Sequence, residues 1–531
     1  MPELAILVHG QRHGLSFQPG PSLRELLDRS AYRVRSACLG HGACGLCRVR
    51  LLAGDAGPPQ AAEKLQLSEA QLADGLRLAC QIRPRTDLTV EIINPAAPSG
   101  WRTPPTGLSG TPAGFAADRP PPPGIGHPCG AAVDLGTTHI SLAVYDLASG
   151  RCLAERWGKN PQGRFGADVV TRLLAAERPE MAQTLAFAAR NAIGEAIDDV
   201  TRREGLDPRR LGRVTVVGNS AMLALLAARN HGLLLQPAYW TAPVDCAASD
   251  GPRWAAAWNI AASAEIELVP PLGGFVGSDL IAGLVASAFT AGPAPALFID
   301  FGTNSEIALW TGETLWVTAT AGGPAFESGV GSCGAPAEAG AVFRVSEATG
   351  GRLAYRILDD DHARGLCGSG LVDLVACLRR SGQIGPTGKF ADGTGAFAFA
   401  VGEQEFALTL RDVDALQRAK AAIGAGIAAL GATAGVPLGA LRRILVAGLF
   451  GRYLDIGNAQ AIGLLPPLAA DRIELAGNTA AAGAAALLIS RQAQAMAERL
   501  RRSAKLVNLA HYPDFDDAFI DHLYLRPMQA D

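Results

Sequence analysis

Four cysteines near the N-terminus constrain this chain more than any other feature. Cys38, Cys44 and Cys47 follow the spacing C-x5-C-x2-C, and Cys80 lies in a separate later segment. Glycines interrupt the loop that carries the first three cysteines, and glycine readily adopts the positive φ angles that a tightly wrapping loop requires. Three thiolates from one loop and a fourth from a distant segment are typical ligands of a 2Fe–2S cluster. The spacing therefore predicts that these four cysteines bind such a cluster.

Two other uses of cysteine are less compatible with this spacing. A structural zinc site usually contains two C-x2–4-C pairs, whereas this segment has one. Disulfides form in oxidising compartments, and the N-terminal sequence MPELAILVHGQRHG lacks the basic start and long apolar core of a signal peptide. We therefore expect a cytoplasmic protein with reduced thiols, in which His41 is a solvated loop residue rather than a ligand.

The segments around the cysteines indicate a β-grasp ferredoxin domain. The expected strands are residues 4–8, 14–17, 49–52 and 88–93. Ser22 and Glu25 have the spacing of a capping box at the start of a helix. The first gap between cysteines is one residue longer than in plant-type ferredoxins, and in this respect the loop is similar to that of adrenodoxin-type ferredoxins.

Length and composition narrow the possible partners. A chain of 531 residues exceeds one hydrophobic core and predicts three or four domains. With 18% charged residues and a net charge of −3, there is no electrostatic argument for a nucleic-acid or membrane partner. Residues 280–299 have the length of a membrane span, but they include a Gly-Pro-Ala-Pro turn. We interpret them as a buried helix, a turn and a buried strand.

A proline-rich segment divides the chain. Residues 95–128 contain ten prolines, a composition that favours extended polyproline conformation over a packed core. Fully extended, the segment would span roughly 100 Å at about 3.1 Å per residue. We interpret it as a tether that carries the cluster between an electron source and an acceptor, and a passive spacer is the alternative. The predicted parts are a ferredoxin domain (1–94), this flexible linker (95–128) and two lobes (129–290 and 291–531).

Two copies of one motif predict a duplicated α/β unit after the linker. An apolar strand runs into each copy, and the copies read Asp134-Leu135-Gly136-Thr137-Thr138 and Asp300-Phe301-Gly302-Thr303-Asn304. In such a turn the aspartate holds Mg²⁺, the glycine lets the backbone approach a phosphate, and amides and hydroxyls donate to phosphate oxygens. Facing copies would clamp a nucleoside triphosphate between two lobes, with Asp134 and Asp300 as the catalytic carboxylates.

Three further segments supply candidate nucleotide residues. The turn 447–451 follows a strand and is expected to pack against the adenosine, and a glycine pair at 322–323 is expected at the phosphates. Lys420 lies on a predicted helix from which it could reach the nucleotide, and a solvated position is the alternative. The complete set of candidates is Gly136, Thr137, Thr138, Gly302, Thr303, Asn304, Gly322, Gly323, Lys420, Gly448 and Gly451.

These motifs carry two resemblances. The segment from about 129 to 531 resembles the superfamily of acetate and sugar kinases, chaperone ATPases and actin. The whole chain, a ferredoxin followed by this ATPase, is similar to the reductive activators of corrinoid-dependent enzymes. That likeness also includes VGNSAM (217–222), GFVGSD (274–279), GGPAFE (322–327), GLCGSGL (365–371) and VNLA (507–510). It implies an α/β multidomain protein with a β-grasp ferredoxin and a duplicated RNase H-like, actin-like ATPase fold of two lobes.

The second resemblance implies a repair reaction. Corrinoid methyltransferases cycle through Co(I), which is occasionally oxidised to inactive Co(II), and an activator that uses ATP and Mg²⁺ returns one electron. The expected partners are a corrinoid protein of a methyltransferase system and an upstream electron donor, and a homodimer through the C-terminal lobes is also expected. Asp134 and Asp300 would hold Mg²⁺, and Asp300 would also orient the attacking water.

Three other functions are compatible with this domain pair. They are a small-molecule kinase, the ATP-driven electron donor of 2-hydroxyacyl-CoA dehydratases, and a redox sensor switched by nucleotide. The dehydratase donor uses a 4Fe–4S cluster between two subunits, so the N-terminal ferredoxin argues against it. A second class of activator carries its clusters at the C-terminus, but no cysteine follows Cys377. Some relatives have a separate middle domain after the linker. Here the first phosphate motif follows at once, so we do not carry over the partner contacts attributed to that domain.

Overall fold

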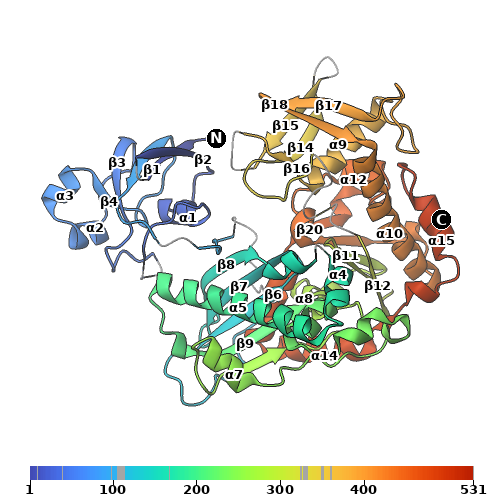
Figure 1. The fold of residues 1–531 in the computed structure, drawn as a ribbon, viewed down its shortest axis with the longest axis horizontal. Coiled ribbons are helices and arrows are strands. Elements are labelled where there is room, and N and C mark those ends of the chain that lie inside the picture. The colour runs from blue at the N-terminus through green and yellow to red at the C-terminus, as the bar shows by residue number, and fades with distance from the viewer. Residues whose placement is uncertain are drawn as a thin grey trace.

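The computed structural model describes residues 1–529 apart from short gaps. These gaps are residues 9, 37, 39, 97–98, 105–113, 167, 323–325, 327–332, 349–351 and 359–361. Figure 1 shows a small N-terminal domain beside a larger body that is built from two lobes. Each of these three parts has a β-sheet of its own.

The N-terminal domain is built on a five-stranded sheet in the order β2-β1-β5-β3-β4. Its elements are β1 (Glu3–Val8), β2 (Gln11–Ser16), α1 (Leu23–Asp28), β3 (Arg48–Gly54), α2 (Ala61–Gln66), α3 (Glu69–Ala73), β4 (Leu76–Leu78) and β5 (Leu88–Ile92). The predicted capping box starts α1, because Ser22 Oγ accepts from the Glu25 amide at 3.3 Å and Glu25 Oε2 accepts from the Ser22 amide at 2.6 Å. This architecture confirms the β-grasp prediction.

The first lobe has a five-stranded sheet in the order β10-β9-β6-β7-β8. Its strands are β6 (Cys129–Leu135), β7 (His139–Asp146), β8 (Cys152–Lys159), β9 (Leu211–Gly218) and β10 (Glu265–Leu268). Its helices are α4 (Val169–Ala175), α5 (Pro179–Glu204), α6 (Ser220–Ala227), α7 (Gly251–Ala257) and α8 (Ser278–Ala286). β6, β7 and β8 are antiparallel neighbours, whereas β9 runs parallel to both β6 and β10.

The second lobe repeats this topology. The order of its main sheet is β20-β19-β11-β12-β13-β21, formed by β11 (Ala296–Asp300), β12 (Ser305–Trp310), β13 (Leu315–Thr320), β19 (Arg443–Ala447), β20 (Ile473–Gly477) and β21 (Lys505–Leu506). Again the first three strands are antiparallel neighbours, and the strand that follows them is parallel to the first. The duplication predicted from the two motifs is therefore present, and the motif-bearing strands β6 and β11 hold equivalent places.

A smaller subdomain and several helices complete the second lobe. They are β14 (Ala341–Glu347), β15 (Leu353–Ile357), β16 (Gly365–Leu366), α9 (Gly368–Arg380), β17 (Ala396–Val401), β18 (Gln404–Thr409), α10 (Leu410–Ala434), α11 (Gly448–Gly451), α12 (Ile456–Ala461), α13 (Thr479–Ile489), α14 (Arg491–Ser503) and α15 (Phe515–His522). Figure 1 shows the hairpin β17–β18 and strands β14 and β15 at the edge of the lobe, away from α14.

Helices α8 and α13 join the two lobes. Their apolar side chains belong to one buried cluster, which also includes Phe298 of β11 and Val217 of β9. The approach is close, since a Cβ atom at Gly483 would lie 2.0 Å from the carbonyl oxygen of Ala282. Residues 280–299 thus form most of α8, a turn and β11, as predicted. Among the described residues, no helix is long and apolar enough to span a bilayer.

The described parts of the proline-rich segment lie against the first lobe. Trp101 is buried beside Gly158 of β8, where an added Cβ would lie 2.8 Å from the indole ring. Arg102 and Trp157 exchange two backbone hydrogen bonds of 2.9 and 2.8 Å. Nearer the end of the segment, Arg119 pairs with Glu267 at 3.1 Å. Residues 105–113 lie outside the described part, and the role of the segment as a moving tether stays a prediction.

Candidate functional site

The four predicted cluster ligands gather at one end of the ferredoxin sheet. Cys47 directly precedes β3 and Cys80 follows β4, and these two strands are paired antiparallel. The Ala79 amide donates to the Cys47 carbonyl at 2.8 Å, which holds the distant fourth segment against the loop. Gly42 has a φ of 77°, and an added Cβ there would lie 2.6 Å from the Cβ of Ala62. The loop therefore needs glycine at this position. His41 is exposed on the loop, as predicted.

The thiols form two pairs that fit a two-iron cluster. Cys38 is in hydrogen-bond contact with Cys44, and Cys47 with Cys80. The Cys47 contact lowers the pKa of Cys80 to about 6, and Arg24 contributes to this shift. Among the described residues, no three His, Cys, Asp or Glu side chains converge as for a single metal ion. A 2Fe–2S cluster instead takes four thiolates, two on each of its two irons, and the observed pairing matches that requirement.

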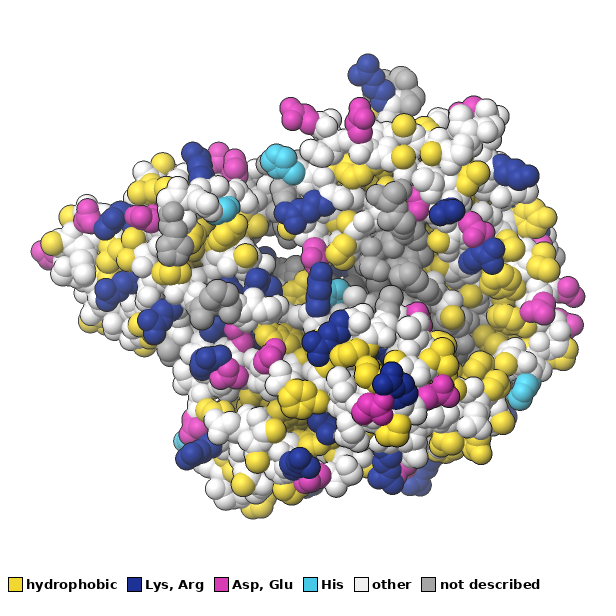
Figure 2. Space-filling model, viewed as in Figure 1, with side chains coloured by type: hydrophobic (Ala, Val, Ile, Leu, Met, Phe, Trp, Pro, Cys, Tyr) yellow, Lys and Arg dark blue, Asp and Glu magenta, His cyan; other side chains and the backbone are white. Residues whose placement is uncertain are grey.

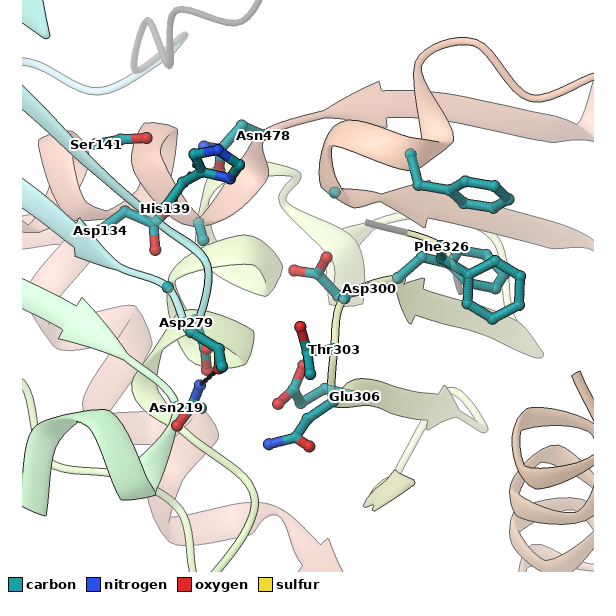
Figure 3. Close-up of a pocket in the computed structure, with 18 of the residues that line it drawn as sticks. Asp134, His139, Ser141, Asn219, Asp279, Asp300, Thr303, Glu306, Phe326 and Asn478 are labelled. Atoms are coloured by element: carbon teal, nitrogen blue, oxygen red, sulfur yellow. Dashed lines mark hydrogen bonds between the residues drawn. The ribbon is translucent and has the colours of Figure 1, made fainter. Parts of the chain in front are cut away.

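The second site is a cavity between the lobes, shown in Figure 3. Asp134 and Asp279 lie on the first-lobe side, and Asp300, Thr303 and Glu306 face them from the second lobe. The predicted residues that line this cavity are Asp134, Gly136, Thr137, Asp300, Gly302, Thr303, Asn304 and Gly448. Two segments 166 residues apart in the sequence are thus brought face to face.

The two motif turns touch each other in this structure. Thr138 Oγ1 lies 3.4 Å from Thr303 Oγ1, across the boundary between the lobes. The cavity has a volume of about 120 Å³, whereas pockets that bind small molecules usually measure roughly 300–1,000 Å³. The cleft is therefore closed where the two turns meet, and we expect a triphosphate to separate them.

Several polar cavity residues were not assigned a role from the sequence. Asn219 Nδ2 donates to Thr137 Oγ1 at 3.0 Å, and Asn478 Nδ2 donates to Asp134 Oδ2 at 3.2 Å. Glu306 is buried on β12, beside the second motif. Burial, together with the charge of Asp134, raises the pKa of Asp279 to about 7. Asn219 and Asp279 lie in the VGNSAM and GFVGSD segments, so the sequence contained a motif that could have pointed to them. Asn478 follows β20 and lies in no such motif.

The cavity offers a donor set suited to Mg²⁺. Carboxylate oxygens are the hard ligands that this ion prefers, and Asp134, Asp279 and Asp300 all line the space. Gly448 has a φ of 88°, and an added Cβ would lie 2.8 Å from Asp300 Oδ1. This glycine therefore leaves room for the Asp300 carboxylate. Behind it, Phe301, Phe326 and Phe450 form a buried aromatic wall with ring centroids 4.9–5.5 Å apart.

Four described residues among the predicted nucleotide ligands do not line the cavity, namely Thr138, Gly322, Lys420 and Gly451. Lys420 is buried between α10 and α15, where its ammonium donates to the His522 carbonyl and burial lowers its pKa to about 8. The structure therefore corrects its assignment, because its helix faces α15 instead of the nucleotide. Gly322 packs on Ser305 behind the second motif, and Gly451 packs on Val446. Gly323 lies outside the described residues.

A larger cavity of about 850 Å³ lies between the ferredoxin domain and the two lobes. It adjoins the first cavity, since His139, Trp157 and Glu338 line both. Its basic residues are Arg29, Arg102, Lys159, Arg356, Arg364 and Arg452. Figure 2 shows Lys and Arg side chains around the hollow beside the N-terminal domain.

Three family models match successive parts of the chain. Residues 6–85 match a 2Fe-2S iron-sulfur cluster binding domain, residues 129–291 match the RACo middle region, and residues 294–531 match the C-terminal domain of RACo, described as its ASKHA domain. ASKHA names the superfamily of acetate and sugar kinases, chaperone ATPases and actin. The segment that matches the middle region is thus the first lobe, which carries the first motif.

The comparison with curated proteins decides the family. The corrinoid activation enzyme RamQ of Eubacterium limosum is 31% identical over 418 residues, which cover 74% of this chain and 69% of that protein. The chain belongs to the RACo-type reductive activators of corrinoid proteins. Such an activator is an enzyme with a 2Fe–2S ferredoxin domain and an ASKHA ATPase domain, as the sequence predicted.

Two further proteins agree with this family. The [Co(II) methylated amine-specific corrinoid protein] reductase of Methanosarcina barkeri is 28% identical over 253 residues, covering 43% of this chain and 45% of that protein. A solved structure described as a reductive activator for corrinoid, iron-sulfur protein matches with a TM-score of 0.67 at 24% identity. It covers 100% of this activator and 99% of that chain, so the likeness in fold extends over all three parts.

Proposed function

We propose that this activator passes one electron from a 2Fe–2S cluster to an inactive Co(II) corrinoid protein, while ATP is bound and hydrolysed between its lobes. The observation that carries the proposal is the presence in one chain of a four-cysteine cradle and of two facing D-x-G-T turns. An electron carrier needs the first feature, and an energy-coupled transfer needs the second. The methylated-amine-specific reductase of Methanosarcina barkeri supports a methyltransferase corrinoid protein as the partner.

The energetics explain why an ATPase accompanies the ferredoxin. A plant-type cluster supplies a single electron at a potential of about −400 mV, and the Co(II)/Co(I) couple is expected to lie lower. For one electron, each gap of about 59 mV opposes transfer by about 1.4 kcal/mol. Nucleotide binding can offset a gap of this kind only if the nucleotide has different affinities for two conformations of the activator. The closed cleft and the open cleft that a triphosphate requires are two such conformations.

Each cavity residue has a proposed role in ATP hydrolysis. Asp134 and Asp300 would hold Mg²⁺ through water, and Asp300 would also orient the attacking water. The motif amides and the Thr137 and Thr303 hydroxyls would donate to phosphate oxygens.

The ATPase assignment is tested by Asp300→Ala. We expect ATP hydrolysis to fall at least 100-fold, because the variant loses both a metal ligand and the group that orients water; the factor is an order-of-magnitude figure for such losses. The visible spectrum of the cluster should not change. Steady-state phosphate release and anaerobic absorption measure the two properties, and ATPase activity near that of the wild type would contradict the assignment.

The electron transfer is tested by cobalt spectroscopy. Anaerobically reduced activator is mixed with a Co(II) corrinoid protein of a methyltransferase system, with and without Mg-ATP. We expect the Co(I) absorption band to appear only with Mg-ATP. An activator with an intact cluster and active ATPase that reduces no corrinoid protein of its organism would favour the nucleotide-switched sensor or the dehydratase donor instead.

The proposal also includes features of the cellular setting. An upstream one-electron donor must reduce the cluster after each transfer, and the ten cysteines are free thiols in this structure, as expected in the reducing cytoplasm. We propose a homodimer through the C-terminal lobes. No nucleic-acid or membrane partner enters the reaction.

A further inference from the structure

Seven buried charged side chains join the ferredoxin domain to the first lobe. They are Arg24, Asp28 and Arg33 from the ferredoxin and Arg156, Asp199, Arg203 and Glu204 from the first lobe. None is more than 8% exposed. We call this set the interface network. Removing one partner of a buried ion pair destabilises a protein, because the other charge is left buried without a partner.

Specific geometry holds the interface network together. Arg33 binds Asp199 through two hydrogen bonds of 2.9 Å each. Arg156 bridges two acidic residues of α5, at 2.6 Å from Asp199 and 3.0 Å from Glu204. Arg203 pairs with Asp28 across the interface, and in this pair the cation belongs to the first lobe and the carboxylate to the ferredoxin. These contacts define one docked position of the ferredoxin domain on β8 and α5.

Arg24 is the member of the network that also reaches the cluster loop. Its guanidinium pairs with Glu204. Its backbone amide donates to the Ala79 carbonyl at 3.0 Å, directly before Cys80. On the loop, an added Cβ at Gly40 would lie 3.6 Å from Arg24 Nη1. The same added Cβ would lie 4.0 Å from the Cβ of Cys80, so the Arg24 guanidinium and this ligand flank one point of the loop.

We propose that Arg24 and Glu204 together set the reduction potential of the cluster according to whether the ferredoxin domain is docked. Reduction adds one electron, and hence one negative charge, and it makes or breaks no bond. The Arg24 cation favours the reduced state. Glu204 opposes that effect, because its carboxylate pairs with the same guanidinium. The inference rests on the proposed cluster ligands and on the proposed direction of electron flow.

The sign of this effect suits an activator. In the docked position Glu204 neutralises Arg24, so the potential is lower and the reduced cluster is a stronger donor to Co(II), which becomes Co(I). Away from the first lobe Arg24 loses Glu204 and keeps only Asp28 of its own helix, at 3.2 Å. The potential is then higher, and an upstream one-electron donor reduces the cluster more easily. One pair of residues therefore separates the accepting state from the donating state.

The test is an anaerobic redox titration of the full chain, followed by visible absorption and by electron paramagnetic resonance. We expect Glu204→Gln to raise the midpoint potential by up to about 59 mV, a tenfold change in the equilibrium between reduced and oxidised cluster. Arg24→Gln should lower it. Asp198→Asn is the matched control on the same helix, because it breaks only the exposed pair with Arg202 and should leave the potential unchanged.

Opposite signs separate this proposal from a purely structural role. If the network only fixed the docked position, both variants would release the ferredoxin and shift the potential in the same direction, and this result would overturn the proposal. If Arg24→Gln does not fold, Glu204→Gln tests the proposal by itself, because Glu204 lies on the first lobe and not in the ferredoxin. An unchanged midpoint potential in Glu204→Gln would also overturn the proposal. A wild-type chain without a 2Fe–2S resonance signal would instead contradict the cluster assignment.

Discussion

At the scale of single residues, the site depends on small side chains that make room for charged ones. Gly448 combines a φ of 88° with an approach in which an added Cβ would lie 2.5 Å from the Phe301 carbonyl oxygen. The Asp300 carboxylate occupies the adjacent space. A larger residue would meet backbone on one side and the Asp300 carboxylate on the other.

Gly448→Ala is therefore expected to impair the ATPase site. The positive φ strains any residue with a Cβ by about 1–3 kcal/mol, and the methyl group displaces Asp300. We expect at least a tenfold loss of ATP hydrolysis, an order of magnitude consistent with a misplaced catalytic group, and an unchanged cluster spectrum. Gly457→Ala is the control, because a Cβ there makes only an ordinary contact of 3.4 Å with Asp455. Equal activity in both variants would contradict the argument.

At the scale of elements, two helices link the cavity to the core between the lobes. Asp279 lies in the first turn of α8, and Asn478 caps α13 by accepting from the Ala481 amide at 3.0 Å. The two helices pack directly against each other, so the relative position of Asp279 and Asn478 depends on their contact. Gly283 and Gly483 make this contact close, since an added Cβ at either would clash with the facing helix.

Gly483→Ala is expected to push α8 and α13 apart. Overpacking of a buried contact destabilises a protein by about 1–3 kcal/mol, and the displaced helices should also lower ATPase activity. Chemical denaturation followed by circular dichroism measures the first effect, and phosphate release measures the second. Ala482→Ser, on the half-buried neighbouring position, serves as the control. A denaturation midpoint equal to that of the wild type would show that the helix contact tolerates the methyl group.

At the scale of the whole molecule, one strand connects the nucleotide cavity with the ferredoxin. Trp157 of β8 lines the cavity and stacks on His139 with ring centroids 4.7 Å apart. The preceding residue, Arg156, holds Asp199 and Glu204 of the interface network. Because the cleft is closed, entry of a triphosphate must move this region of the first lobe relative to the second.

Binding of Mg-ATP is therefore expected to change the potential of the cluster. Movement of β8 alters the contact between Glu204 and Arg24, so the midpoint potential of the wild type should shift when Mg-ATP is added. Glu204→Gln lacks the responding charge and should show no shift. Redox titrations of both proteins with and without Mg-ATP measure this, and equal shifts in the two would show that the nucleotide acts by another route.

The sequence by itself determined the chemistry and the fold of this activator. The spacing of Cys38, Cys44 and Cys47 predicts a cluster loop because local chain geometry decides how a short loop wraps. The repeated D-x-G-T turns predict a duplicated ATPase fold because each turn is a local structure at the end of an apolar strand. The capping box at Ser22 is likewise a local structure, so the four residues that form it are enough to predict the start of the helix.

Only the tertiary structure decided which distant residues meet. Lys420 had a plausible helical position, yet the packing of α10 on α15 directs it away from the nucleotide. Asn478 reaches Asp134 across 344 residues of sequence. Arg24 meets Glu204 across 180 residues. No local pattern encodes such pairs, because each depends on how complete domains dock. The charges that couple the ferredoxin to the ATPase therefore become visible only in the folded molecule.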